Sequence, residues 1–169
     1  VATNYTFSYV AGALTVTKAN QTITFTQAGV TYGDAAFALG GSASSGLTVS
    51  YDASTTLSVC TVLGATVTIV TAGNCTITAS QAGGANYNAA VDVEVTFAID
   101  AATLTVTADP QTKTYNTANP SPLTFAYGAF AYAEDSTDLT TEPTCSTTAV
   151  LGSSVAGSTY PITCSGGVA

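Results

Sequence analysis

The stretch Val91-Asp92-Val93-Glu94-Val95-Thr96-Phe97-Ala98-Ile99 alternates apolar with polar or small residues, and this alternation decides the fold class. Successive side chains of a β-strand point to opposite faces, so a period of two places one face on a core and the other in water. The same period recurs at residues 66–70, 75–79 and 14–17, where threonine fills most polar positions. We therefore expect an all-β chain with antiparallel sheets.

Short clusters of turn-forming residues separate these runs. Gly, Ser and Asn gather at residues 40–41, 44–46, 72–74 and 83–84. Strands of about 5–9 residues with a turn signal every 8–12 residues are typical of a β-sandwich. We expect the turn at residues 72–74 to close a hairpin, with Cys75 near the strand that carries Cys60.

Charged residues are scarce and mostly acidic. Only 7% of residues are charged, and two Lys/Arg against ten Asp/Glu give a net charge of −8. Binding to nucleic acid requires basic side chains that neutralise phosphates, so this composition argues against it, and an anionic membrane surface would repel the chain. No apolar run reaches the ~18 residues that span a bilayer, so we expect no membrane insertion in this segment.

Catalytic side chains are equally scarce. The chain has no histidine, and its serines lie in turns without a neighbouring base. We therefore predict that this segment is not an enzyme and takes no cofactor. Asp34, in Tyr32-Gly33-Asp34, is better explained as a turn residue whose carboxylate accepts hydrogen bonds from nearby backbone amides.

The four cysteines lie two in each half of the chain. Cys60 with Cys75 and Cys145 with Cys164 are the local pairs, although four cysteines allow three connectivities. A zinc site is the competing interpretation, but it usually shows close Cys-x₂₋₄-Cys spacing or histidines, and neither is present. Two disulfides indicate an oxidising, extracellular location.

Two parts of the chain repeat a pattern. Residues 13–25 and 102–115 each hold Leu-Thr-Val-Thr, a short polar break and a second strand that glutamine opens. Tyr32-Gly33-Asp34 and Tyr115-Asn116-Thr117 follow at corresponding places. The chain is therefore expected to contain related repeats.

These residues resemble a known family. Residues 4–16, Asn-Tyr-Thr-Phe-Ser-Tyr-Val-Ala-Gly-Ala-Leu-Thr-Val, resemble the closing strands of the MBG domain. This domain is a bacterial Ig-like repeat found in tandem in large secreted or surface proteins and adhesins. Residues 103–106, 115–118, 143–145 and 157–167 look like the front part of the same domain. Residues 21–99 are similar to a related repeat that shares the Tyr-Gly-Asp turn, in place of which the later segment has Tyr115-Asn116-Thr117.

The resemblance implies tandem Ig-like β-sandwiches with a strand segment shared between neighbouring repeats. In this interpretation residues 1–17 are closing strands that complete the preceding copy, residues 18–100 are a complete Ig-like repeat, and residues 101–169 are an MBG-like domain that lacks its last strands. The 169 residues would then be one period of a longer array. The alternative, closure of residues 101–169 by residues 1–17 of the same chain, would require residues 18–100 to fold back along their length.

An unfinished sandwich exposes an edge and an apolar face, which normally attract a partner strand. The expected inter-repeat strand presents Tyr5, Phe7, Tyr9, Leu14 and Val16. The expected partners are neighbouring copies of the same repeat, either in one covalent array or as a donor-strand filament.

One loop could bind a ligand. Residues 131–142 contain an acidic cluster, which is either a solvated loop or a weak calcium candidate formed by Glu134, Asp135 and Asp138. The expected function is a structural repeat of an extracellular stalk or filament that spaces an adhesive or tip function from the cell surface. The alternative is a glycan- or protein-binding adhesin module that acts through the 131–142 loop.

Overall fold

The computed structural model describes residues 4–157 and 159–169. In this part of the chain the regular structure consists of β-strands and two single-turn 3₁₀ helices, η1 (Ser136–Asp138) and η2 (Val155–Gly157). The predicted all-β class is confirmed. No helix in the described residues is both long and apolar enough to cross a membrane.

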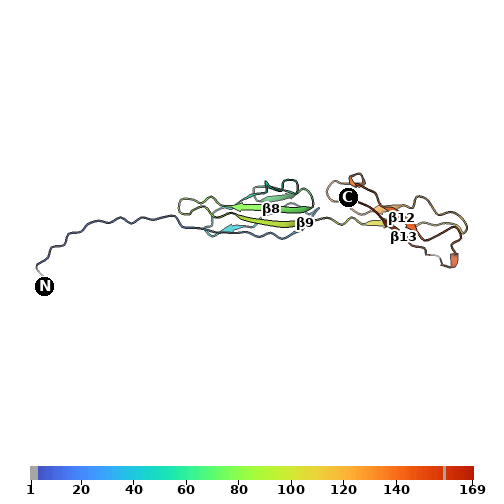
Figure 1. Cartoon of the computed structure of the whole chain (residues 1–169), viewed down its shortest axis with the longest axis horizontal. Coiled ribbons are helices and arrows are strands. Elements are labelled where there is room, and N and C mark those ends of the chain that lie inside the picture. Colours follow the sequence, from blue (N-terminus) through green and yellow to red (C-terminus); the bar gives the residue numbers. More distant parts are fainter. Residues whose placement is uncertain (1–3, 158) are drawn as a thin grey trace. The chain divides into compact units, whose positions relative to one another are not determined.

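The chain forms two compact units. The first unit comprises the residues up to Gly29 together with Ala36–Ala98, and the second comprises Val30–Ala35 together with Ile99–Ala169. Figure 1 shows β8 and β9 in the first unit and β12 and β13 in the second. The division into residues 1–17, 18–100 and 101–169 stays a prediction, and residues 1–3 lie outside the described part. The Ig-like identity of each unit and the shared strand stay predictions as well.

The strands of the first unit belong mainly to two sheets, in which three antiparallel pairings are defined. β7 pairs with both β3 and β6 in one sheet, and β8 pairs with β5 in another sheet that also contains β9. The strands that lie wholly in the first unit are β1 (Ile23–Thr24), β3 (Phe37–Ala38), β4 (Ser42–Ala43), β5 (Ser50–Asp52), β6 (Cys60–Leu63), β7 (Thr66–Ile69) and β8 (Gly73–Ser80), of which β1 and β4 pair with each other. β9 (Val93–Asp100) begins in this unit, and its last two residues belong to the second.

Both sheets contribute side chains to one core. Val67 of β7 and Ile77 of β8 are fully buried, and along β7 and most of β8 every second residue is buried, as the period of two predicts. The rings of Phe37 in β3 and Phe97 in β9 meet edge to face with centroids 6.1 Å apart. The alternating sequence therefore forms a core between two sheets.

The hairpin predicted at residues 72–74 is wrong. β7 and β8, which flank this turn, belong to different sheets, and β7 instead forms a hairpin with β6. The segment crosses between sheets, and Cys75 of β8 is buried in the core, where it is bonded to Cys60 of β6. This disulfide joins two strands that share no backbone pairing.

The second unit contains short strands and almost no core. β2 (Val30–Thr31) runs parallel to the last two residues of β9, while β10 (Val106–Ala108) pairs with β11 (Phe125–Tyr127) and β12 (Thr144–Thr147) with β13 (Ile162–Ser165). Ile99, at the start of this unit, is buried, and among residues 101–157 and 159–169 only Pro143 is. Two-stranded sheets are marginally stable by themselves, so this unit relies on other restraints.

One of those restraints is a disulfide. Cys145 and Cys164 lie directly opposite each other on β12 and β13 and are bonded, with their Cα atoms 4.0 Å apart. Unlike the Cys60–Cys75 bond, this disulfide links strands that are already paired by backbone hydrogen bonds.

Candidate functional site: an exposed apolar segment and an open groove

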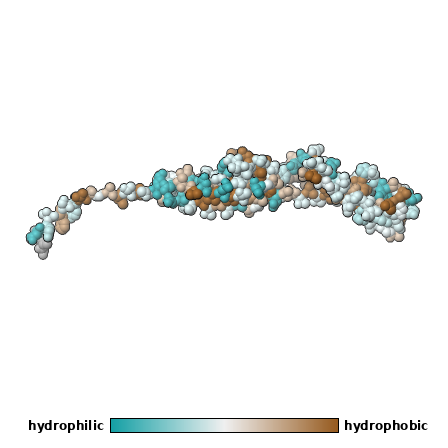
Figure 2. Space-filling model, viewed as in Figure 1, coloured by the Kyte–Doolittle hydropathy of each residue, from teal (hydrophilic) through white to brown (hydrophobic). Residues whose placement is uncertain are grey.

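The N-terminal segment, residues 4–18, is an extended chain that forms no strand in the described structure. Its aromatic side chains are open to solvent: Tyr5 is 80% exposed, Phe7 83% and Tyr9 90%. Leu14 and Val16 are equally exposed, and Figure 2 shows apolar side chains uncovered along this segment. The strand predicted at residues 14–17 does not form here because a strand requires a partner for its backbone groups. A contiguous exposed apolar surface marks an interaction site.

The segment presents these side chains in a regular order. The rings of Phe7 and Tyr9 are stacked, with centroids 6.3 Å apart and planes 20° apart. In an extended chain residues two positions apart share a face, so Tyr5 belongs to the same row. Leu14 and Val16 resume the alternation with the opposite parity. The first row is therefore a strand-like aromatic face without a partner in the described structure.

The C-terminal end of this segment is fixed by hydrogen bonds within the first unit. The backbone of Ala19 donates to the carbonyl of Asn86 at 2.9 Å and accepts from the amide of Asn88 at 2.8 Å. Next to it, the buried side chain of Gln21 donates to the Asn88 carbonyl at 2.7 Å and to the side chain of Gln81. The exposed segment therefore joins the first unit at a well-defined point, Ala19, which follows its last residue.

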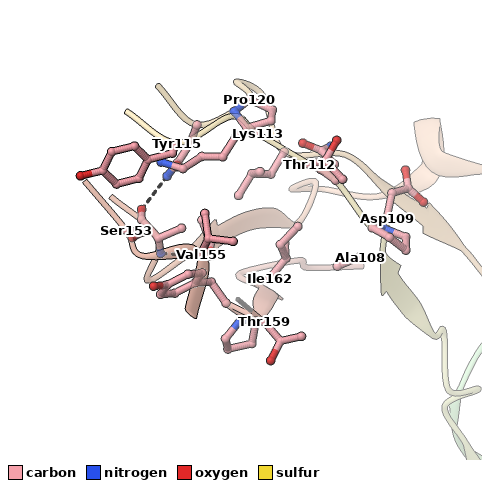
Figure 3. A pocket seen from close by; sticks show the side chains of 18 of the residues that line it. Ala108, Asp109, Thr112, Lys113, Tyr115, Pro120, Ser153, Val155, Thr159 and Ile162 are labelled. Atoms are coloured by element: carbon pink, nitrogen blue, oxygen red, sulfur yellow. Dashed lines mark hydrogen bonds between the residues drawn. The ribbon is translucent and has the colours of Figure 1, made fainter. Parts of the chain in front are cut away.

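An open groove of about 650 Å³ lies in the second unit. Segments from three parts of the unit line it, and in Figure 3 Val155 and Ile162 lie between the segment of Lys113 and Tyr115 and the segment of Thr159. Tyr115 is 61% exposed and Val155 is 70% exposed, so the groove has an apolar mouth that solvent reaches. Its volume is in the range of about 300–1,000 Å³ that binding sites occupy.

Three side-chain oxygens of the second unit are buried without a hydrogen-bond partner among the described residues. They are Oε1 of Gln111, Oδ1 of Asn119 and the hydroxyl of Tyr127, and the first two residues line the groove. The amide nitrogens of the same two side chains are satisfied, by Thr124 at 2.8 Å and by the Ala149 carbonyl at 2.6 Å. Buried polar atoms are almost always paired, so the packing around the groove is incomplete.

A third feature of the second unit joins the Tyr32 turn to the loop at residues 131–138. The Tyr32 hydroxyl donates to Oε1 of Glu134 at 2.7 Å, and the Tyr132 hydroxyl donates to the Asp34 carbonyl at 2.9 Å. The two tyrosine rings meet edge to face, with centroids 5.1 Å apart. Asp34 Oδ2 accepts from the amide of Thr31 at 2.8 Å, which confirms the predicted turn role.

This contact raises the pKa of Tyr32 and accompanies an unusual backbone conformation at Tyr132. The hydrogen bond to the Glu134 carboxylate, followed by desolvation, raises the pKa of Tyr32 to about 12. Tyr132 has a φ of 49°, a left-handed conformation that costs a bulky residue energy. The contacts of its ring and hydroxyl with the Tyr32-Gly33-Asp34 turn hold it there. The 131–138 loop is therefore shaped by this turn.

The acidic residues of the loop hydrogen-bond to nearby groups. Asp135 caps η1 and accepts from the amide and the hydroxyl of Thr137, at 2.8 and 2.7 Å, and these bonds lower the pKa of Asp135. Asp138 accepts from the Asp135 amide at 2.9 Å, and Glu134 holds Tyr32. In residues 4–157 and 159–169, no group of three or more His, Cys, Asp or Glu side chains is placed to hold a metal ion. The calcium candidate at Glu134, Asp135 and Asp138 therefore has its carboxylates in local hydrogen bonds.

Sequence reasoning missed the groove. Its lining comes from segments around residues 108–123, 147–149 and 153–162, which no shared motif connects. Tyr115-Asn116-Thr117, which stands in the place of the Tyr-Gly-Asp turn, also forms a turn. Asn116 adopts a φ of 60°, and the Thr117 amide donates to the Thr114 carbonyl at 3.2 Å. Asparagine tolerates the left-handed conformation well, so it replaces glycine in this turn.

Comparison with known families gives one match. Residues 104–169 match the MBG domain (YGX type), a repeat module typical of surface proteins and generally non-catalytic. This agrees with the resemblance found in the same residues. No curated protein and no solved structure matches the chain.

Proposed function

We propose that this chain, whose residues 104–169 match the MBG domain, is a structural repeat of an extracellular stalk or filament, linked end to end with identical or similar copies. In this role it spaces an adhesive or tip function from the cell surface. The two disulfides support an oxidising, extracellular environment. The joint between copies is the N-terminal segment, in a covalent array or in a donor-strand filament.

The observation that carries the proposal is the exposed aromatic row at Tyr5, Phe7 and Tyr9. This row is extended, contains no charged residue and has side chains 80–90% exposed, so it is costly to leave in water and suited to adding a strand to a neighbouring molecule. The segment leaves the first unit at Ala19, where backbone and side-chain hydrogen bonds fix its direction. A surface that joins one copy to the next is what a structural spacer requires, whereas a ligand pocket is not.

The alternative proposal, glycan or protein binding through the 131–142 loop, has less support. The hydroxyl of Tyr132 and the carboxylate of Glu134, two of the groups that would contact such a ligand, are occupied by the Tyr32-Gly33-Asp34 turn. A glycan array probed with the full chain tests this alternative. Affinity that is lost in Tyr132→Ala and Glu134→Ala would favour it over the spacer.

Analytical ultracentrifugation of the full chain tests the proposed joint. We expect association that rises with concentration, and Phe7→Asp should weaken it by on the order of 10- to 100-fold, because burying one large apolar side chain contributes about 1.5–3 kcal/mol. Val91→Asp is the matched control, since Val91 is 86% exposed and lies outside the segment. A wild-type chain that stays monomeric, or a Phe7→Asp chain that associates like wild type, would refute the proposal.

A further inference from the structure

The second unit has a groove but no closed core, and the N-terminal segment has apolar side chains but no partner. We propose that the strand Tyr5–Tyr9 of one copy inserts into the groove of the second unit of another copy. This inference rests on the proposed end-to-end joint and names its acceptor. The groove in question is the one lined by Gln111, Lys113, Tyr115, Asn119, Val155 and Ile162.

Complementarity of surface is the first argument. Only Pro143 is buried among residues 101–157 and 159–169, while the first unit buries side chains from both of its sheets. The apolar walls of the groove, with Val155 and Tyr115 largely exposed, would gain the most from an inserted apolar strand. Each Phe or Tyr buries about 150–250 Å², so the row Tyr5, Phe7 and Tyr9 supplies about 600 Å². A stable interface buries about 800 Å² per partner, and the strand backbone adds the remainder.

Complementarity of charge is the second argument. Residues 4–17 contain no Asp, Glu, Lys or Arg, so the inserted strand carries no charge of its own out of water. The charged side chains that line the groove are Asp109 and Lys113, which have opposite signs. The cation at the groove, Lys113, already donates to the carbonyls of Thr117 at 3.1 Å and Val150, and does not require an acidic occupant. A charged peptide or nucleotide would fit this groove less well than a neutral strand.

Hydrogen bonding is the third argument. Oε1 of Gln111 and Oδ1 of Asn119 are buried acceptors at the groove without a donor among the described residues. A strand supplies backbone amides, and Tyr5 and Tyr9 add hydroxyl donors. In the described residues the sheets β10–β11 and β12–β13 contain two strands each, so each presents an outer edge to which a strand can be added. The exposed apolar walls, the unpaired acceptors and the open sheet edges of the second unit therefore match the apolar side chains, donors and extended backbone of the N-terminal segment.

A complementation experiment on full chains tests this acceptor. Phe7→Asp disables the donor and leaves the groove intact, whereas Val155→Asp disables the groove and leaves the donor intact. We expect each variant alone to associate on the order of 10- to 100-fold more weakly than wild type, because each loses the burial of one large apolar side chain. Mixed in equal amounts, they should form a one-to-one dimer in the ultracentrifuge, with the Val155→Asp segment in the Phe7→Asp groove. Tyr115→Asp is a second groove variant, in case Val155→Asp fails to fold by circular dichroism.

The outcomes separate this inference from the proposed joint. If both groove variants associate like wild type while Phe7→Asp does not, the groove is not the acceptor and the joint survives. If Phe7→Asp associates like wild type, or the wild-type chain is monomeric, both are refuted. Hydrogen exchange needs no groove variant: residues 111–115 and 153–157 should exchange at least 10-fold more slowly in assembled wild type than in monomeric Phe7→Asp. Equal exchange in the two samples would overturn the inference.

Discussion

The two disulfides close loops of similar length, yet we predict that their removal has different effects. Their sequence separations are 15 and 19 residues, and the chain-entropy model assigns about 3 kcal/mol to each. Cys60 and Cys75 are fully buried and join β6 to β8, two strands in different sheets. Cys145 and Cys164 are only partly buried and join strands that already pair.

The perturbations are Cys60→Ala with Cys75→Ala, and Cys145→Ala with Cys164→Ala. The first pair loses about 3 kcal/mol from loop closure and about 1 kcal/mol more for each buried sulfur that leaves a cavity, a total of about 5 kcal/mol. The second pair removes no buried sulfur and should lose about 3 kcal/mol or less. Domains are stable by about 5–15 kcal/mol, so the first change removes a third or more of the stability of its unit.

Native-state hydrogen exchange read by mass spectrometry is the suitable assay, because it reports each unit separately. The amides of β8 should lose most of their protection in the first variant, and those of β12 and β13 should lose less in the second. Reduction of the Cys145→Ala and Cys164→Ala variant breaks the Cys60–Cys75 bond but keeps both sulfurs, which separates loop closure from packing. Losses that agree within about 1 kcal/mol between the two variants, or a larger loss in the second, would refute the reasoning.

Two further predictions concern single residues. Gly64→Ala and Gly83→Ala both place a side chain at a positive φ, 63° and 83°, which costs about 1–2 kcal/mol. A Cβ at Gly64 meets nothing within 4 Å, whereas one at Gly83 would lie 2.6 Å from a backbone carbonyl oxygen. Urea unfolding should therefore show a clearly larger loss of unfolding free energy for Gly83→Ala than for Gly64→Ala. Equal losses would contradict the clash. The Tyr32 hydroxyl, with a pKa of about 12, should ionise about two pH units above an ordinary tyrosine, and Glu134→Gln should lower this value. Because the folded state holds this proton more tightly, the contact stabilises the second unit below pH ~10 and loses its effect as the pH rises to about 12. ¹³C NMR of the tyrosine rings follows this titration. A Tyr32 pKa equal to that of an ordinary tyrosine would contradict the hydrogen bond.

The amino-acid sequence alone determined the features that depend on local periodicity. The alternation at residues 66–70, 75–79 and 91–99 predicted β7, β8 and β9 to within a few residues, because the side-chain period of a strand is a property of its own backbone. The same holds for the turn role of Asp34, whose carboxylate reaches an amide only three residues away. The scarcity of charge and the absence of histidine are properties of the composition and need no structure.

Only the tertiary structure decided which strands are neighbours. The turn at residues 72–74 has the composition of a hairpin, but the chain crosses it from one sheet to the other, since burial of Cys75 beside Cys60 outweighs the local preference. The Tyr32–Glu134 hydrogen bond joins residues 102 positions apart, and the groove of the second unit is assembled from three separate segments. Contacts of this kind depend on how segments distant in the sequence pack together, which no local pattern encodes. The resemblance at residues 4–16 predicts a strand, but a strand forms only where a partner edge completes its hydrogen bonds.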